Sequence, residues 1–371
     1  MNWDAVPMTS GVLSGIRIVE VAGIGPGPFC GMLLADLGAE VVLVERQEQD
    51  VDPLVDLGRA AIVHRGKRSI ELDLKNSASI EILLRLLETA DGLIEGLRPG
   101  VMERLGLGPD ICLARNPRLA YGRITGWGQE GPLSQSAGHD LNYVGLSGAL
   151  WYAGHPGEPP VTPPTLIGDV GGGALYLAIG LLAAILHVRH GGMGQVIDAA
   201  IVDGSAHLTS ILLSLRAAGR MPTERGKGVL DGSHWSNSYR CADGRDICVQ
   251  SFEPRFYRIL LEKIGLGGDP DFNEQLNPTR WPEQRRKLAA HFASRPRAEW
   301  LALLDGSDAC YAPVLSPEEA SRHPHLAARG TYLEIDKLLQ AAPAPRFSRG
   351  NVAPGPVPER GADTASILAS L

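Results

Sequence analysis

The sequence predicts an α/β protein with a mostly parallel sheet, followed by a smaller α+β domain. Within the first 50 residues, two short β-branched runs flank a glycine- and proline-rich turn and a helical stretch, which is the order of a β-α-β unit. Further along, YRCADGRDICVQS places two strand-like runs around Asp243-Gly244, which is typical of a β-hairpin. The chain has 371 residues, enough for two folding units.

The first domain alternates strands and helices up to about residue 127. Runs rich in Val and Ile predict the strands, and helical spacing between them predicts the helices, the first of which ends at Gly38, a common helix stop. The expected elements are strand 16–21, helix 28–37, strand 39–45, helix 79–90, strand 92–97, helix 109–115 and strand 118–127. Because helices connect consecutive strands, we expect the strands to run parallel.

Two apolar helical stretches follow, at 141–150 and 172–188, and QVIDAA (195–200) is expected to be the last strand of the first domain. The second domain should contain the hairpin and two helices, 254–266 and 283–295, and the proline-rich C-terminal tail should pack back on the first domain. The predicted boundaries are 1–200 plus 340–371 for the large domain, 201–229 for a linker helix, 230–320 for the small domain and 321–339 for a returning linker.

Composition and charge disfavour several classes of protein. Forty-two acidic against 35 basic residues give a formal charge of −7, which disfavours nucleic-acid binding. The five cysteines form no C-x-x-C pair, so we expect reduced thiols, no metal site and a cytoplasmic protein. The N-terminus lacks the basic and apolar pattern of a signal peptide. The most apolar stretch, 174–186, is about five residues short of a membrane span, so we expect a buried helix and no membrane insertion.

A glycine-rich turn joins the first strand to the first helix. Backbone N–H groups at a helix N-terminus bind anions, so this turn is a candidate phosphate site. Gly25, Gly27 and Cys30 give G-x-G-x-x-C where a Rossmann dinucleotide fingerprint has a third glycine, although Glu45 ends the next strand 20 residues after Gly25. A tight structural turn is the alternative, and the sequence leaves both open. No Walker loop is present.

Four cations follow predicted strands: Arg46, Lys75, Arg98 and, one turn later, Arg104. The carboxyl ends of strands in an open parallel sheet face the ligand crevice. Each cation alone is explained as a solvated surface charge. Their shared location favours a phosphorylated ligand.

Three residues are candidates for chemistry. His139 in GHDLNY follows a glycine-rich loop. The alternative to a chemical role is that His139 is an ordinary loop residue and that Asp140 beside it is the helix N-cap. Asp169 in IGDVGGGALY is either the N-cap of the apolar helix, or an acid/base group or nucleophile beside glycines that permit close ligand approach. Glu253 precedes Pro254 at an expected first helical position, so an acid at a helix N-terminus is its structural explanation.

Several blocks of the sequence are long and unusual, and they extend over nearly the whole chain. They are LSGIRIVEVAGIGPGPF (13–29), LLADLGAEVVLVER (33–46), DLK (73–75), IEGLRPGVMERLGLGP (94–109), TGWGQEGP (125–132), GHDLNY (138–143), GDVGGG (168–173), FEPRFY (252–257) and PAPRFSR (343–349). Together they resemble CoA-transferase family III, and within it the α-methylacyl-CoA racemase branch. The segment 47–66 is longer than in the racemase pattern.

The resemblance implies a large domain with a parallel-sheet Rossmann-like core and a small α+β domain, joined by long linkers, in an interlocked homodimer. It also implies an acyl-CoA thioester as substrate, with CoA as part of the substrate and no separate cofactor or metal. The positions that match contacts to the CoA thioester are Ile24, Arg46, Leu72, Asp73, Leu74, Lys75, Gly96, Leu97, Arg98, Arg104, Gly138, Asp140, Leu141, Asn142 and Tyr143.

The histidine of the GHD motif marks the racemases of this family. The resemblance therefore implies an isomerase of fatty acid metabolism that inverts the α-carbon of 2-methylacyl-CoA by two-base proton transfer through an enolate. His139 and Asp169 would be the two bases, Glu253 would accept a hydrogen bond from His139, and backbone N–H groups near the start of the helix after Asp169 would hold the enolate oxygen. One alternative is a transferase in which Asp169 is the nucleophile that forms a mixed anhydride. A second is a catalytically silent acyl-CoA-binding paralogue.

Overall fold

The structure is a computed structural model that describes residues 11–47 and 57–371. The chain folds into two compact units. Unit 1 consists of residues 1–148, 163–208 and 330–371, and unit 2 consists of residues 149–162 and 209–329. Residues 48–56 of the segment 47–66, whose length differs from the racemase pattern, lie outside the described residues.

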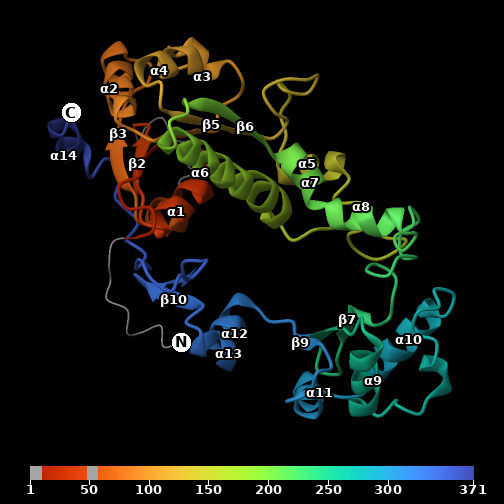
Figure 1. Cartoon of the computed structure of the whole chain (residues 1–371). Helices are drawn as coiled ribbons and strands as arrows, with labels where there is room; N and C mark the ends of the chain where they lie inside the picture. Colours follow the sequence, from red (N-terminus) through yellow and green to blue (C-terminus); the bar gives the residue numbers. More distant parts are fainter. Residues whose placement is uncertain (1–10, 48–56) are drawn as a thin grey trace. The chain divides into compact units, whose positions relative to one another are not determined.

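Unit 1 is built on a six-stranded sheet in the order β3-β2-β1-β4-β5-β6 (Figure 1). Its strands are β1 (Arg17–Val21), β2 (Glu40–Glu45), β3 (Arg68–Glu71), β4 (Gly92–Glu95), β5 (Ala120–Thr125) and β6 (Gln195–Ala200). Every neighbouring pair is parallel, which confirms the predicted α/β fold with a parallel sheet. The order reverses between β1 and β4, so the loops after these two strands diverge and leave a crevice between them.

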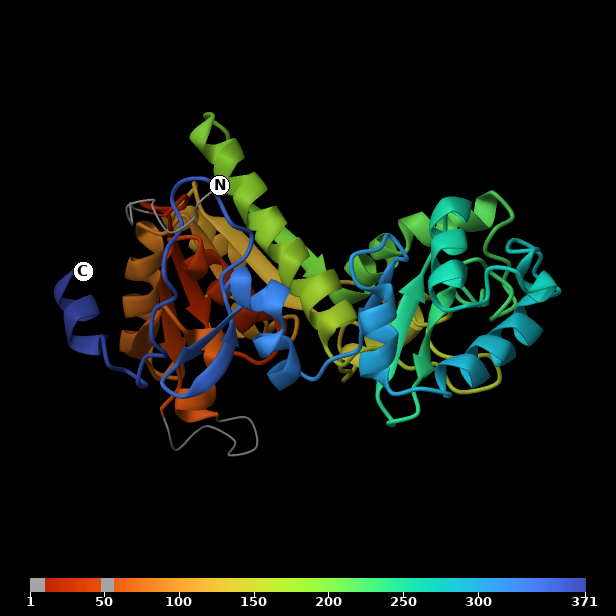
Figure 2. The same cartoon turned by 90° about the horizontal axis from the view of Figure 1, so that it is seen from below.

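Helices cover both faces of this sheet because successive side chains of β1 point in opposite directions. Val19 and Val21 belong to a core shared with α2, α4 and the C-terminal helix α14, whereas Ile18 belongs to a core shared with α1 and α6. Figure 2 shows the orange helices and the green α6 on opposite sides of the strands. The helices of unit 1 are α1 (Pro26–Asp36), η3 (Gly58–Ala60), η4 (Ile62–His64), α2 (Ser77–Glu88), α3 (Val101–Arg104), α4 (Pro109–Arg115), α5 (Asp140–Ser147), η5 (Leu166–Ala174), α6 (Leu175–Arg189), α7 (Ile201–Leu208) and α14 (Thr364–Ala369).

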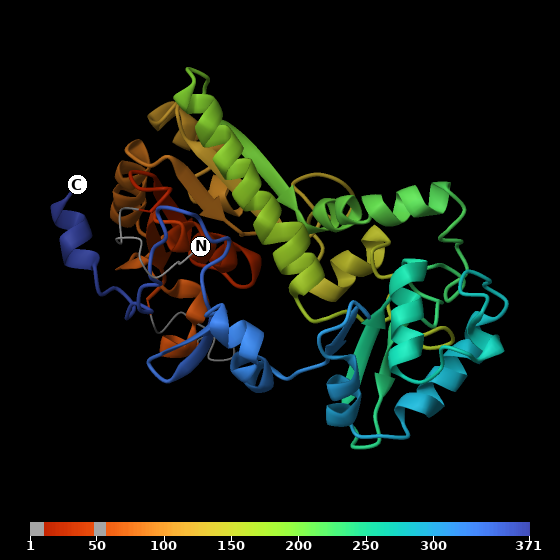
Figure 3. The same ribbon diagram turned by 60° about the horizontal axis from the view of Figure 1, so that its bottom comes forward.

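The π-helix η5 continues directly into α6, and together they lie along the sheet (Figure 3). This continuous helix of 24 residues is long and apolar enough, by length and composition alone, to cross a membrane. The expectation of a stretch too short for a span was therefore wrong, because the helix begins at Leu166 and not near Ala174. One face of α6 is buried on the sheet through residues such as Leu177 and Leu181, as in the core helix of a globular protein.

Unit 2 contains a three-stranded antiparallel sheet packed with helices around its own aromatic core. The predicted hairpin is confirmed: β7 (Ser236–Arg240) pairs with β8 (Asp246–Gln250), and Gly244 in the turn has φ +75°. The other elements of unit 2 are α8 (Ser210–Ala217), α9 (Pro254–Lys263), η6 (Pro270–Phe272), α10 (Trp281–Phe292), α11 (Arg297–Leu304), β9 (Tyr311–Pro313), α12 (Pro317–Arg322) and α13 (Pro324–Ala328).

The two units divide the chain differently from the expected boundaries. The expected linker helix 201–229 is split, with α7 in unit 1 and α8 in unit 2, and residues 321–329 of the expected returning linker belong to unit 2. Residues 149–162 belong to unit 2, because Arg225 donates hydrogen bonds to the carbonyl oxygens of Ala153 and Glu158 at 2.8 and 2.9 Å. Residues 330–339 belong to unit 1, because β10 (Tyr332–Ile335) pairs with β11 (Leu338–Ala341) in a hairpin of that unit. The expected returning linker is thus partly a hairpin.

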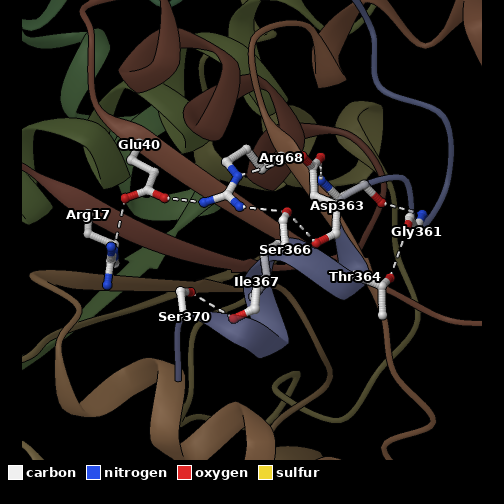
Figure 4. A network of polar contacts seen from close by, with 10 residues as sticks. Arg17, Glu40, Arg68, Gly361, Asp363, Thr364, Ser366, Ile367 and Ser370 are labelled. Atoms are coloured by element: carbon white, nitrogen blue, oxygen red, sulfur yellow. Dashed lines mark hydrogen bonds and ion pairs between the residues drawn. The ribbon is translucent and has the colours of Figure 1, made fainter.

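The C-terminal segment covers the open edge of the sheet at β3 (Figure 4). Asp363 donates its N–H to the Ser69 carbonyl oxygen, and its carboxylate accepts the Ser69 N–H at 2.9 Å, which replaces a missing neighbouring strand. Arg68 contacts Ser366 and is ion-paired with Glu40, as Figure 4 shows. The tail therefore packs back on the first domain, as predicted, and removes an exposed strand edge.

Candidate active site

A cavity of about 420 Å³ lies at the carboxyl ends of the strands of unit 1. It is lined by the β1–α1 turn, the residues that follow β4 and β5, the loop before α5, and the side chains of Tyr143, Asp169 and Ile201. This is the crevice that the reversal of strand order opens between β1 and β4. His139 and Asp169, far apart in the sequence, both line it.

Asp169 lies inside η5, four residues after its N-cap Thr165, and is not itself an N-cap. The structural alternative proposed for it is therefore wrong, because the helix begins earlier than the glycine run suggests. A Cβ atom added to Gly25 in the β1–α1 turn would lie 3.2 Å from Asp169 Oδ2, so the carboxylate is against this turn. Burial, and after it the charge of Asp140, raises the pKa of Asp169 to about 6, while His139 acts in the opposite direction.

His139 is the N-cap of α5 and is exposed on the wall of the cavity. Its backbone N–H donates to Asn142 Oδ1 at 3.0 Å. Asp140, expected as the N-cap, is instead the first helical residue, and its carboxylate accepts the N–H of Asp169 at 2.9 Å. Asp140 thus connects His139, which it directly follows in the chain, to the turn of η5 that carries Asp169.

The aromatic side chains of Tyr143 and Trp127 form the wall next to His139. Their rings meet edge to face at a centroid distance of 4.7 Å, and the Tyr143 hydroxyl donates to the Gly138 carbonyl oxygen. A side chain at Gly126 would collide with the Tyr143 ring at 2.0 Å, so this glycine makes room for the aromatic pair. The Trp127 indole N–H is buried and, among the described residues, has no acceptor.

The three glycines after Asp169 serve helix packing, which corrects the expectation that they admit the ligand. A Cβ atom at Gly172 would lie 2.6 Å from Ser205 Oγ on α7, and one at Gly173 would lie 3.0 Å from Ile201. Backbone-to-backbone contact between η5 and α7 requires these small residues. Their function is to hold η5 in place, and Gly25 is the glycine that lies against the carboxylate.

The predicted cations lie at the carboxyl ends of β2, β3 and β4, at one edge of the sheet. Arg98 lines the cavity, whereas Arg46, Lys75 and Arg104 lie outside its lining. Within the described part of the chain, the exposed guanidinium groups of Arg46, Arg98 and Arg104 form no ion pair. Unpaired cations at this edge are suited to a ligand with several phosphate groups.

A partly buried ion-pair network shapes the loop that carries Arg98. Arg123 on β5 donates to Glu95 Oε1 at the end of β4 and to Glu103 Oε1 on α3, both at 2.8 Å. The other Glu95 oxygen accepts the Leu97 N–H at 2.8 Å. Both ends of the loop 96–103 are therefore bound to one guanidinium group.

The β1–α1 turn does not form a dinucleotide site of the usual kind. The Glu45 carboxylate, 20 residues after Gly25, is buried, accepts a hydrogen bond from the Ser69 hydroxyl and has the Arg360 Nη1 atom 4.0 Å away. Cys30, at the position of the third glycine, is fully buried against the sheet. The structural alternative for the turn fits these contacts, because Glu45 is used within the protein.

Comparison with known proteins identifies the chain. Residues 13–364 match the model of the family described as "CoA-transferase family III". The chain belongs to CoA-transferase family III. Mouse α-methylacyl-CoA racemase is 42% identical over 361 residues, which cover 96% of this chain and 92% of the mouse protein. The human α-methylacyl-CoA racemase is 42% identical over 90% of this chain and 86% of its own length. The crystal structure of a CAIB/BAIF family protein from Brucella suis is similar, with a TM-score of 0.80 and 26% identity over 98% of this chain and all of that chain.

The positions expected to contact the CoA thioester fall into two groups. Those that line the cavity are Ile24, Gly96, Leu97, Arg98, Gly138 and Tyr143. Those outside its lining are Arg46, Leu72, Asp73, Leu74, Lys75, Arg104, Asp140, Leu141 and Asn142. Leu72 is buried in the core, so only its backbone is available to a ligand, and the Asp73 carboxylate accepts the Lys75 N–H at 2.9 Å.

Glu253 lies in unit 2, as the exposed N-cap of α9 directly before Pro254. Its structural explanation, an acid at a helix N-terminus, agrees with this position. The cavity that contains His139 and Asp169 is built from unit 1 alone.

Sequence reasoning missed several residues that line this cavity, chiefly Trp127, Ile124, Ser134 and Ile201. Trp127 belongs to the conspicuous block TGWGQEGP, which was a usable signal. Ile124 and Ile201 are ordinary apolar residues that only the tertiary structure brings to the cavity. No group of three or more His, Cys, Asp or Glu residues that could hold a metal ion occurs in the part of the chain that the structure describes.

Proposed function

We propose that this protein racemises 2-methylacyl-CoA thioesters at the α-carbon, by proton transfer through an enolate. The observation that carries the proposal is that His139 and Asp169 line one cavity of unit 1. The mouse and human racemases, 42% identical to this chain, support the same chemistry. Inversion needs two groups on opposite sides of a planar enolate, one starting protonated and the other deprotonated.

The environment of Asp169 suits an acid/base role. An efficient general acid or base has a pKa near the working pH, and burial together with Asp140 brings the pKa of Asp169 to about 6. In one direction Asp169 removes the α-proton and His139 delivers one to the opposite face. In the other direction their roles exchange, so both groups are needed for inversion.

The enolate oxygen requires hydrogen-bond donors, and the expected donors after Asp169 are used within the protein. The Asp169 N–H donates to Asp140, and the Val170 N–H donates to the Thr165 carbonyl oxygen. The first turn of α5 is a better candidate, because a helix leaves its first N–H groups without intrahelical acceptors. We assign this role to the backbone of Asp140 and Leu141, which do not line the cavity themselves but directly follow His139 on its wall.

The cationic edge of the sheet is proposed to hold the CoA part of the substrate. Arg46, Arg98 and Arg104 would contact its phosphate groups, and the cavity would receive the thioester end. CoA stays bound to the acyl group as a thioester throughout the reaction, so the proposed mechanism uses no separate cofactor or metal. A cytoplasmic location remains part of the proposal.

Self-association into the interlocked homodimer of the family is proposed to cover two apolar surfaces. On α6, Leu175, Ile179 and Leu186 form an exposed stripe, with Ile179 63% exposed. In α8, which carries Ile211 and Leu213, no residue is buried. A second copy would bury these faces and bring its Glu253 to His139. Sedimentation at nanomolar concentration should detect no folded monomer, whereas a reversible monomer would contradict interlocking.

Proton exchange tests the proposed reaction. Each pure enantiomer of a 2-methylacyl-CoA is incubated in heavy water with no acyl acceptor, and α-deuterium and configuration are measured. The wild type should exchange and invert both enantiomers. His139→Ala should stop inversion but leave exchange of one enantiomer, and Asp169→Ala should leave exchange of the other. Both substitutions spare the backbone bond between the Asp169 N–H and Asp140, so the fold should persist.

The proton-exchange experiment has two control variants, and two other results would identify a different function. His325→Ala and Asp110→Asn change exposed residues of the same types outside the cavity and should behave as wild type. The family name itself favours one second function, CoA transfer with Asp169 as nucleophile. Transfer to a free carboxylate by an active His139→Ala enzyme would establish that function instead. CoA binding with neither reaction would identify a silent paralogue.

A further inference from the structure

The Asp140 carboxylate is bound to the helix turn that carries Asp169. Asp140 Oδ1 accepts the Asp169 N–H at 2.9 Å, and Asp140 Oδ2 accepts the Thr165 N–H at 3.3 Å. Thr165 has φ +63°, a conformation that non-glycine residues rarely adopt. One carboxylate on α5 thus holds both the unusual start of η5 and the residue with the candidate catalytic group.

Close contact at this point depends on a glycine. A Cβ atom on Gly168 would lie 2.4 Å from Asp140 Oδ1 and 2.8 Å from Val144 Cγ2. Gly168 has ordinary backbone geometry, so the need for glycine here comes from space and not from conformation. The chain therefore leaves room for the Asp140 carboxylate to reach the backbone of η5.

The arrangement also places two carboxylates near each other in a partly buried site. The titratable groups on the elements packed against η5 are His139, Asp140 and Tyr143 at α5, Asp203 and His207 on α7, Tyr176, His187 and Arg189 on α6, Asp198 on β6, Tyr121 and Arg123 on β5, and Cys30 and Asp36 on α1. Of these, Asp140 raises the pKa of Asp169, His139 lowers it, and the charge of Asp169 raises the pKa of Tyr143. His207 is bonded to the Tyr176 hydroxyl, and Asp198 accepts the Gln129 N–H at 3.0 Å.

We propose that the Asp140 side chain is a positioning residue for the reaction: it fixes the turn of η5 that carries Asp169 and supplies the negative charge that this carboxylate faces. The inference rests on the proposed acid/base role of Asp169. It differs from a substrate contact, because the Asp140 carboxylate points into the protein backbone and not at the ligand.

The charge has a predictable effect on catalysis. In the racemase, the productive free enzyme carries one proton shared between Asp169 and His139, so kcat/KM follows a bell-shaped pH profile. Protonation of Asp169 contributes to the acid limb. Because a nearby negative charge favours the protonated carboxyl, its removal should move that limb to lower pH. The equilibrium constant between the enantiomers fixes the ratio of kcat/KM in the two directions. The acid limb should therefore shift equally in both directions.

Two substitutions separate charge from position. Asp140→Asn removes the charge but retains one acceptor oxygen, which can keep the shorter bond from the Asp169 N–H while the 3.3 Å bond from the Thr165 N–H is lost. It should shift the acid limb down by about 1 pH unit in both directions. Asp140→Ala also removes the acceptor, and should in addition lower kcat at the pH optimum at least tenfold relative to Asp140→Asn. Asp110→Asn, an exposed carboxylate on α4, makes the same change in net charge and should leave the profile unchanged.

A measurement without substrate separates this inference from the proposed function. Carbon-13 NMR of labelled aspartate, with Asp169→Asn for assignment, gives the titration midpoint of Asp169 directly. A lower midpoint in Asp140→Asn supports the inference. An unchanged midpoint and an unchanged acid limb would overturn it while leaving racemisation intact. Absence of α-proton exchange by the wild type would overturn the proposed function and, with it, the catalytic meaning of Asp140.

Discussion

Replacement of Arg123 by Met should destabilise unit 1 through the Glu95 carboxylate. The Glu95 side chain is fully buried and that of Arg123 is 7% exposed, and they are joined by a 2.8 Å hydrogen bond. Removing one partner of such a pair leaves a buried charge without compensation, at a cost of about 3–5 kcal/mol in the free energy of unfolding. Glu103 is much more exposed, so Glu103→Gln should cost about 1 kcal/mol or less.

The cost of Arg123→Met should depend on pH with a defined sign. Burial already raises the pKa of Glu95 above its usual range, although the Leu97 N–H and Arg123 oppose this. Without Arg123 the pKa of Glu95 should rise further. The folded variant then keeps a proton on Glu95 at a pH where the unfolded chain, with its usual carboxyl pKa, has lost it. The variant should therefore be nearly as stable as the wild type near pH 4.5, and the deficit should grow as pH rises from about 4.5 toward 7.

Urea denaturation at pH 5 and pH 7, monitored by hydrogen exchange of peptides from β4 and β5, measures this effect. The double variant Glu95→Gln with Arg123→Met should recover most of the loss, because no buried charge remains. The same variants should raise KM for acyl-CoA, since the loop with Arg98 loses its anchor. A deficit below about 1 kcal/mol at pH 7, or one that does not vary with pH, would refute the reasoning.

Three further outcomes are expected. Arg46→Ala or Arg104→Ala should raise KM for acyl-CoA about tenfold while kcat changes little, because phosphate contacts are equal in ground and transition states; unchanged KM in both would contradict the CoA site. Gly25→Ala, at φ +70° and 3.2 Å from Asp169 Oδ2, should lower thermal stability by about 1–2 kcal/mol and reduce kcat, whereas wild-type turnover would show that the turn does not constrain Asp169. Burial lowers the pKa of His234 to about 3, so unit 2 should lose about 1.4 kcal/mol per pH unit as pH falls below about 6.5, and denaturation of His234→Gln should show a smaller dependence.

Local patterns predicted the larger part of the fold. The strands β1, β2, β4 and β5, the helices α1, α2 and α4, the hairpin of unit 2 and the docking of the C-terminal tail follow from periodicity, turn residues and proline content. The strand β3 was missed because RSIE has four residues, two of them charged, and its strand character comes from pairing with β2. The β10–β11 hairpin was missed because its turn uses Asp336 and Lys337 at positive φ, without the glycine that marks such turns.

The sequence predicted which residues belong to the candidate site but not the contacts that surround them. His139 and Asp169 were selected from their motifs, but their structural alternatives assumed helix starts that were wrong by one and by four residues. The bond between Asp140 and Asp169 spans 29 residues across a proline-rich segment, so no local pattern encodes it. The packing function of Gly172 likewise depends on α7, which follows about 30 residues later.

The electrostatics of Asp169 bear on the choice between the two reactions of the family. With a pKa of about 6, this carboxyl is mostly ionised at pH 7, so it remains competent as a nucleophile as well as a base. A raised pKa therefore does not by itself exclude acyl transfer. The imidazole decides the matter, because a mixed anhydride needs no second proton carrier, whereas inversion of a carbon needs one on the opposite face. The presence of His139 in the same cavity is thus the feature that favours racemisation over transfer.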